Sequence, residues 1–282
     1  MSELILEGKD IRYTYPCGKD ALMGLDIRVT GGKRLAVLGA NGSGKTTLFL
    51  CLNGTLTAKN GSIFLDGRKM GYSHRELNEW RSKVGLVFQN PDDQVVAGTV
   101  IQDIAFGPLN LGMPPEEARA KAVGILRELN IAHYVERPTH ELSHGERKLV
   151  AIAGVLVMNP SVIILDEPLA GLDPAGADQV RKALDDVHAR GTTLVISTHD
   201  MDFAYEWADE VVVLSKGRTL RQGPVEELFS DAELLKQTNL QEPWIHGLTK
   251  SLLDSRLIGT ESKPLRSRKA VMDLLAGMKH SR

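Results

Sequence analysis

The chain has 282 residues, of which 42% are hydrophobic and 25% are charged. These fractions are usual for globular proteins and exclude an intrinsically disordered or collagen-like chain. The formal net charge of −2 at pH 7 gives no global electrostatic reason for a nucleic-acid partner, so we expect none. Only glycine is in excess, with 27 residues, and this surplus needs a structural use.

The cysteines and the apolar stretches indicate in which cellular compartment we expect the protein. Cys17 and Cys51 lack the spacing of a disulfide framework or a zinc site, which favours a reducing compartment. The first ten residues lack the basic and apolar regions of a secretory signal. The longest apolar stretch, Val150 to Met158, is far shorter than the ~20 residues that span a bilayer. If the protein works in transport, we expect it to do so as a peripheral subunit.

The first third of the chain alternates strand and turn signals. Alternating apolar and polar residues predict strands over 4–15 and 24–29. Residues 34–39 are a short apolar run that is typical of a buried parallel strand, and this run ends in a glycine-rich turn. The next predicted elements are a helix over 46–54, a strand and turn over 61–70 and a strand over 83–89.

The middle and last thirds favour an α/β fold. Residues 90–141 have helical composition broken by five prolines, and 114–131 is the clearest helix. A helix over 143–157 opens with a Ser N-cap and a Glu three residues later, which is a capping box. Apolar strands at 161–168, 192–198 and 210–215, separated by helical segments, predict a parallel sheet covered on both faces; a strand at 219–223 and further helices follow.

A phosphate-binding motif lies between the predicted strand 34–39 and the predicted helix 46–54. Gly39 to Thr46 matches G-x4-G-K-[ST], whose glycines let backbone N–H groups turn toward an anion at a helix N-terminus. Lys45 is expected to bind the β- and γ-phosphates, and the Thr46 hydroxyl to bind Mg²⁺. The predicted nucleotide-binding residues are Gly39, Ala40, Asn41, Gly42, Ser43, Gly44, Lys45, Thr46 and Thr47.

Two acidic residues follow the apolar strand Val162–Leu165. Ligands bind at the carboxyl ends of parallel strands, so Asp166 and Glu167 are expected beside the phosphate loop. Asp166 is predicted to hold Mg²⁺, directly or through water, and Glu167 to orient or deprotonate an attacking water.

Further motifs stand in order around these residues. The stretch LSHGE, residues 142–146, resembles the LSGGQ signature of ATP-binding-cassette (ABC) ATPases. Gln89 after a strand, AGLDP at 170–174 and His199 after another strand match the family's Q-loop, D-loop and switch histidine. Tyr15 resembles the aromatic residue that stacks on adenine. The resemblance covers about residues 3–225.

The resemblance implies a P-loop ABC cassette with a parallel-sheet core, an N-terminal antiparallel β subdomain and a helical signature subdomain over about 90–158. Its active form is a dimer, most simply a homodimer, in which each signature closes the other subunit's ATP. The implied residue roles are catalysis for Glu167, His199, Gln89 and Lys45; Mg²⁺ binding for Thr46, Gln89 and Asp166; contact with the partner's ATP for Ser143, His144, Gly145 and Glu146; and the D-loop for Asp173. His144 departs from the usual glycine and either narrows the room for a phosphate or adds a pH-sensitive charge.

Within the family, FQNPDDQ at 88–94 and the stretch at 141–174 resemble the ATPase subunits of energy-coupling-factor (ECF) importers, most closely those for cobalt and nickel. This resemblance implies docking on an ECF coupling transmembrane protein at the cytoplasmic face of the cell membrane. A separate membrane subunit captures the solute. Three classes stay open: a metal or vitamin importer ATPase, a non-transport ABC ATPase, and a module that holds ATP without hydrolysing it.

The C-terminal segment differs from the rest of the chain. We divide the sequence into a cassette over 1–228 and a helical extension over 229–282. From Lys250 to Arg282, eight Lys or Arg stand against three Asp or Glu. An apolar stripe in this segment predicts an amphipathic helix that either packs back on its own domain or contacts another subunit; its members are Val271, Leu274, Leu275 and Met278.

Overall fold

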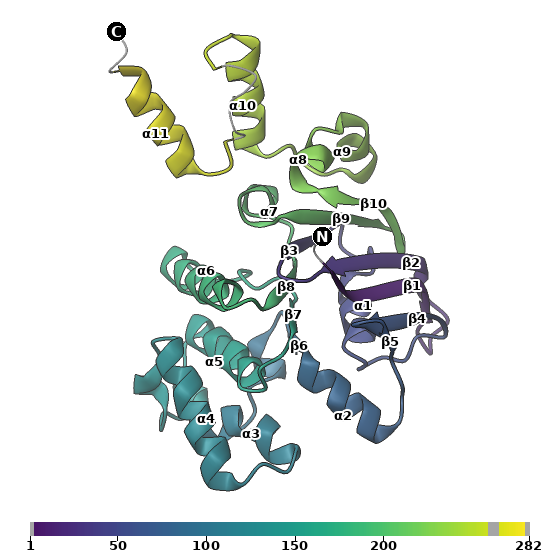
Figure 1. Cartoon of the computed structure of the whole chain (residues 1–282), viewed down its shortest axis with the longest axis vertical. Helices are drawn as coiled ribbons and strands as arrows, with labels where there is room; N and C mark the ends of the chain where they lie inside the picture. The colour runs from purple at the N-terminus through teal and green to yellow at the C-terminus, as the bar shows by residue number, and fades with distance from the viewer. Residues whose placement is uncertain (1–2, 259–264, 280–282) are drawn as a thin grey trace.

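The computed structural model describes residues 3–258 and 265–279, and it contains two sheets (Figure 1). The larger has the order β10-β9-β3-β8-β7-β6; all neighbours are parallel except β10, which pairs antiparallel with β9. The smaller is antiparallel, with the order β2-β1-β4-β5. The strands are β1 (Leu4–Thr14), β2 (Asp20–Thr30), β3 (Arg34–Leu38), β4 (Asn60–Leu65), β5 (Arg68–Lys69), β6 (Val84–Val87), β7 (Val162–Leu165), β8 (Thr193–Ser197), β9 (Glu210–Ser215) and β10 (Arg218–Pro224).

Helices surround the larger sheet. In Figure 1, α3, α4 and α5 gather at one end of the molecule, and α10 and α11 lie at the other end. The helices are α1 (Lys45–Leu52), α2 (His74–Lys83), α3 (Val100–Asn110), α4 (Pro115–Glu128), α5 (His144–Leu156), α6 (Pro174–Ala189), α7 (Met201–Trp207), α8 (Val225–Phe229), α9 (Ala232–Thr238), α10 (Trp244–Asp254) and α11 (Arg268–Lys279). Short 3₁₀ turns are η1 (Pro91–Asp93), η2 (Ala132–Tyr134) and η3 (Thr139–Glu141).

The parallel strands are buried on both faces, which explains their continuous apolar sequence. Alternate side chains of β7 enter different hydrophobic clusters: Ile163 and Leu165 pack with the helices α3 to α6, and Val162 and Ile164 pack against α1 and the smaller sheet. The predicted fold class, a parallel-sheet core with an antiparallel β subdomain and helices, is therefore confirmed.

Three local features differ from the sequence pattern or add to it. The apolar period does not predict α2, in which Trp80 is the one buried side chain, although Ser73 and Glu76 form a capping box at its start. Pro108 lies inside α3, two residues before the helix ends, and does not separate two helices. The expected boundary after residue 228 falls within α8, whose Leu228 and Phe229 belong to the same hydrophobic cluster as the cassette.

The C-terminal helix α11 packs partly on its own domain. Val271 is buried in the large cluster and Leu274 packs against it, while Leu275 is 45% exposed. The Arg266 guanidinium donates to the carbonyl oxygen of Tyr205 and anchors the segment that leads into α11. The Met278 side chain lies outside the described residues. Among the described residues, no helix has the length and apolar character needed to cross a bilayer.

Candidate nucleotide-binding and hydrolysis site

The phosphate loop joins β3 to α1 and is shaped by glycines with positive φ. Gly39 has φ 149° and Gly44 has φ 110°. A Cβ atom on Gly39 would lie 2.4 Å from the Leu214 carbonyl oxygen, and one on Gly44 would lie 2.9 Å from that of Ala21. Only glycine meets both requirements, so the sequence motif and the strand-to-helix turn agree.

Two polar groups of this loop are buried and suited to an anion. The Lys45 ammonium donates to the carbonyl oxygens of Gly39 at 2.7 Å and Ala40 at 3.3 Å, and burial lowers the pKa of this lysine. The Ser43 hydroxyl is buried and has no hydrogen-bond partner within the described structure. A phosphate at the N-terminus of α1 would satisfy the Ser43 hydroxyl and the Lys45 charge, so the loop fits a nucleotide.

The ends of the neighbouring parallel strands bring the next predicted residues together. The Thr46 hydroxyl donates to Asp166 Oδ2 at 2.6 Å. Asp166 directly follows β7, and Gln89 lies just beyond the end of the adjacent β6; all three residues line one cavity of about 630 Å³. A hydroxyl, a carboxylate and an amide carbonyl are hard oxygen donors, so this set fits Mg²⁺.

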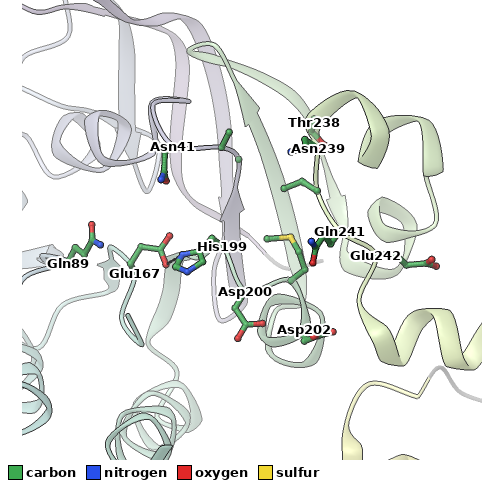
Figure 2. A pocket seen from close by; sticks show the side chains of 14 residues that line it. Asn41, Gln89, Glu167, His199, Asp200, Asp202, Thr238, Asn239, Gln241 and Glu242 are labelled. Carbon is green, nitrogen blue, oxygen red and sulfur yellow. Dashed lines mark hydrogen bonds and ion pairs between the residues drawn. The ribbon is translucent and has the colours of Figure 1, made fainter. Parts of the chain in front are cut away.

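Glu167 and His199 form a pair at the ends of β7 and β8. The buried Glu167 carboxylate lies 2.9 Å from His199 Nδ1, and the His199 side chain is 73% exposed. Figure 2 shows this pair next to Gln89, and all three residues line one cavity. Glu167 has φ 46°, an unusual value for a residue with a side chain, and its backbone N–H donates to the Ser197 hydroxyl at 2.9 Å.

Tyr15 contacts Thr47 of α1. The two hydroxyl oxygens are 2.9 Å apart, and the Tyr15 ring packs edge-on against Tyr13. Tyr15 is half-buried. Its ring therefore stands beside the helix that begins at the phosphate loop, where a base stacked on it would remain connected to the bound phosphates.

The signature residues line a different cavity. Ser143, His144, Gly145 and Glu146 border a space of about 420 Å³ together with the D-loop segment from Gly171 to Gly176. Asp173 caps α6, where its Oδ1 accepts the Gly176 N–H at 2.7 Å. The cavity that holds Glu167 and His199 includes none of the four signature residues. Ser143, Gly145 and Glu146 therefore lie apart from the cavities that contain phosphate-loop residues, Asp166 and Glu167.

Glu146 is fully engaged within its own chain. Its carboxylate accepts the Ser143 N–H at 2.7 Å and an Arg137 N–H at 3.0 Å. Burial acts to raise the pKa of Glu146, but hydrogen bonds from Ser143, Tyr134 and Arg137 outweigh it and lower the pKa to about 2. The carboxylate is therefore an ionised cap of α5.

His144 borders both the signature cavity and the cavity lined by Thr46, Gln89 and Asp166. Gly171 of the D-loop stands against the ring, because a Cβ on that glycine would lie 3.6 Å from His144 Nε2. The imidazole occupies space that a glycine would leave open.

The family model described as ABC transporter matches residues 22–170, which is more than half of the chain. This chain belongs to the ABC transporter family. Energy-coupling factor transporter ATP-binding protein EcfA of Methanosphaera stadtmanae is 43% identical over 88% of this chain and 89% of its own length. Cobalt import ATP-binding protein CbiO of Rhodobacter capsulatus is 44% identical over 97% of this chain and 98% of its own length. The cassette is an ECF-type ATP-binding subunit, an ABC ATPase coupled to transport.

Solved structures share the ABC cassette fold. The structure of cbiO1 from Clostridium perfringens, part of the ABC transporter complex cbiONQ, has a TM-score of 0.74 and 40% identity over 88% of this chain and 99% of that chain. The cassette MJ0796, solved as a dimer with ADP and phosphate, has a TM-score of 0.70 and 25% identity over 78% and 99% of the two chains. ABC cassettes of this fold bind adenine nucleotides and dimerise.

The sequence motifs did not reveal every residue at this ABC site. Ser197 is fully buried; its hydroxyl donates to Asp166 Oδ1 at 2.5 Å and accepts the Glu167 N–H, so it orients both acidic residues. The cavity of about 600 Å³ beside Glu167 and His199 is also lined by Asp200, Asp202 and the segment 238–242 (Figure 2). Ser197 is the polar last residue of the apolar strand β8, a position from which the sequence could have predicted a role at the site. The segment 238–242 reaches the cavity only through tertiary packing.

Proposed function

We propose that this chain is the ATPase subunit of an ECF-type importer that energises uptake of a transition-metal ion, cobalt or nickel, through separate membrane subunits. The observation that carries this proposal is the meeting of the phosphate loop, the Asp166–Glu167 pair and His199 at the carboxyl ends of β3, β7 and β8. The cobalt import name of a relative aligned over 97% of this chain supports the choice of metal.

In this proposal the phosphate loop binds the nucleotide and the Glu167 carboxylate acts as general base. Lys45 and the loop N–H groups bind the β- and γ-phosphates. Glu167 accepts a proton from the attacking water, and His199 holds the carboxylate in place through its 2.9 Å contact while its exposed edge meets the γ-phosphate. Gln89 orients the water or the metal, and Tyr15 stacks on the adenine.

Mg²⁺ is the proposed metal cofactor. Thr46, Asp166 and Gln89 would hold it beside the phosphate loop, where it neutralises charge on the β- and γ-phosphates. The contact between the Thr46 hydroxyl and Asp166 Oδ2 supports this assignment, because it brings two hard oxygen donors into position before any ion is bound.

A second copy of the chain completes the proposed site. Because Ser143, Gly145 and Glu146 line a cavity apart from those that contain Thr46, Asp166 and Glu167, the N-terminus of α5 is offered to a partner's nucleotide. The dimeric cassette with ADP and phosphate supports a dimer, and a homodimer is the simplest assembly. In such a dimer the His144 imidazole would lie at the partner's γ-phosphate.

An exposed apolar patch beside the Q-loop, residues 88–94, is the proposed contact with the coupling transmembrane protein. The patch consists of Val96, Phe106, Leu109 and Leu111, which are 77%, 60%, 41% and 49% exposed. The backbone N–H of Val96 donates to Asp103 of α3, so the patch is continuous with the segment that follows the Q-loop. Such a patch is typical of a protein interface and supports a contact with a membrane subunit at the cytoplasmic face.

Replacing Phe106 with Glu is expected to prevent copurification with the membrane subunits while leaving ATP affinity within about two-fold of wild type. A charge in the centre of an apolar interface is left without a partner, which weakens the complex. The measurement is the amount of membrane protein recovered with affinity-tagged chain. Leu220→Glu is the matched control, since Leu220 is 40% exposed on β10 at the opposite edge of the sheet. Equal recovery with Phe106→Glu and wild type would show that the patch is not the docking surface.

The exposed apolar residues of the C-terminal extension are proposed to stabilise the ATPase dimer. Met272 and Leu275 of α11 are 58% and 45% exposed, and Trp244 at the start of α10 is 49% exposed. Val271 and Leu274 of α11 face their own domain. The amphipathic helix therefore has one apolar side available for a second subunit.

Changing both Met272 and Leu275 to Glu is expected to raise the dimer dissociation constant about ten-fold or more. The dissociation constant is measured by analytical ultracentrifugation in the presence of ATP, with each variant also carrying Glu167→Gln so that ATP is not hydrolysed. These substitutions are sharper than removing residues 265–282, because the truncation also removes the Arg266 anchor on Tyr205. Glu substitutions at the exposed Gln237 and Ser251 change the net charge by the same amount and are the controls for charge. An unchanged dissociation constant would leave α11 as a structural helix only.

A further inference from the structure

One lysine of the signature helix is completely buried, and the proposed mechanism does not use it. Lys148 lies in the second turn of α5 with no exposed surface. Its ammonium donates to the carbonyl oxygen of Phe88 at 3.2 Å and to that of Gln89. Burying an ammonium is costly unless strong acceptors surround it, so a lysine at this position requires these two carbonyls.

The two carbonyls belong to the turn that carries the Gln89 side chain. This turn is also held by the Asp166 N–H, which donates to Val87 O at 3.0 Å, and by Gln94, whose Oε1 accepts the Phe88 N–H at 3.0 Å. These contacts fix the end of β6 before residue 89. Lys148 fixes the carbonyl of residue 89 itself, and it does so from another part of the chain.

The neighbouring arginine joins α5 to the far end of the same turn. Arg147 pairs with Asp92 in η1, and it also donates to Leu142 O at 3.0 Å. The first two turns of the signature helix therefore hold the Q-loop at residues 88–89 and at residue 92. A movement of the N-terminus of α5 would be transmitted to the backbone of Gln89 through the Lys148 side chain.

We propose that Lys148 is a positioning residue of this ATPase, whose buried ammonium sets the backbone of Gln89 and thereby the place of the Gln89 side chain at the nucleotide. The inference rests on the proposed role of Gln89. Through Lys148, helix α5 contacts the reaction site of its own chain. In the proposed dimer, the N-terminus of the same helix faces the partner's nucleotide. Loss of the two hydrogen bonds from the ammonium frees the turn, and a displacement of this kind lowers the rate of the reaction more than it lowers substrate affinity.

A double-mutant cycle with Lys148→Met and Gln89→Ala tests this inference. Steady-state ATP hydrolysis is measured for the full chain together with the membrane proteins that copurify with it. Alone, Lys148→Met is expected to lower kcat about ten-fold and to leave KM for ATP within about two-fold, and Lys148→Arg, which keeps donors, is expected to recover most of the loss. In the Gln89→Ala background, Lys148→Met should lower kcat less than about two-fold, because the side chain it positions is gone.

Three results would contradict the proposed role of Lys148 or of Gln89. A ten-fold loss in both backgrounds overturns the inference, because Lys148 then acts on the fold or on the charges of Asp166 and Glu167. Wild-type kcat for Lys148→Met also overturns it. Wild-type kcat for Gln89→Ala would instead refute the proposed role of Gln89. Lys33→Met, at the opposite end of β3, is the matched control, and Lys148→Gln enters the same cycle if the Met variant does not fold.

Discussion

Replacing Glu167 with Gln is expected to lower the rate of ATP hydrolysis by about 10² to 10⁴ while ATP still binds. The carboxylate follows β7, is buried, and is held at 2.9 Å from His199 Nδ1 and by the Ser197 contact to its backbone. An amide of the same shape preserves this arrangement but accepts a proton poorly. Phosphate release and equilibrium binding of labelled ATP, measured on the same preparation, separate the two effects.

The control for this substitution is Glu79→Gln, on the exposed side of α2, where the carboxylate pairs with Arg68 and Lys83. Its rate is expected to equal that of wild type. Addition of EDTA to the wild type should reduce hydrolysis to the level of the Glu167→Gln variant, because Thr46 and Asp166 then lack the metal that they are proposed to hold. If Glu167→Gln hydrolyses ATP within about three-fold of wild type, the general base is another group.

Replacing Lys45 with Met is expected to weaken ATP binding about 100-fold or more, which corresponds to about 2.8 kcal/mol. Hydrogen bonds to charged phosphate oxygens each contribute about 1.5–3 kcal/mol, and the Lys45 ammonium can make more than one. Methionine fills the same buried space without the charge. Isothermal titration calorimetry with ATP on the Glu167→Gln background measures the affinity without turnover.

For the Lys45→Met variant we also predict the effect on the melting temperature. Burial lowers the pKa of Lys45, so folding disfavours its charged form, and removing the charge should not lower the melting temperature of the nucleotide-free protein. Lys33→Met removes a partly buried lysine paired with Glu210 and should leave ATP affinity unchanged. ATP affinity that survives in the Lys45→Met variant would contradict the assignment of the phosphate loop.

Much of the site could be predicted from the sequence because its chemistry depends on short motifs at strand ends. The apolar run before Gly39 and the one before Asp166 identify buried parallel strands, and such strands bring their carboxyl ends to one edge. The continuation of α3 past Pro108 and the presence of α2 are harder to predict from the sequence. Pro108 removes one backbone hydrogen bond near the end of α3, and the helix continues because Ile101, Ile104 and Ala105 pack in the core, which the local sequence does not show. Helix α2 lies on the surface with only Trp80 buried, so it lacks an apolar period.

The remaining residues depend on contacts between distant parts of the chain. Ser197 and Asp166 are separated by 31 residues, and Lys148 and Gln89 by 59. A lysine in the second turn of a helix is usually solvated, and no local pattern distinguishes one that reaches two backbone carbonyls of another segment. The segment 238–242 enters the cavity because Asn239, with φ 55°, ends α9 and turns the chain back toward His199.

Uptake of radiolabelled Co²⁺ or Ni²⁺ into sealed vesicles tests the proposed function most directly. The vesicles contain the chain with its copurifying membrane subunits, oriented with the ATPase facing the lumen, where MgATP is enclosed, because an importer moves its solute toward the side of its ATPase. We expect accumulation that requires ATP with the wild-type chain and none above background with Glu167→Gln. Equal accumulation with both chains would contradict a role for this ATPase in transport, and ATP hydrolysis accompanied by vitamin uptake without metal uptake would contradict the choice of solute.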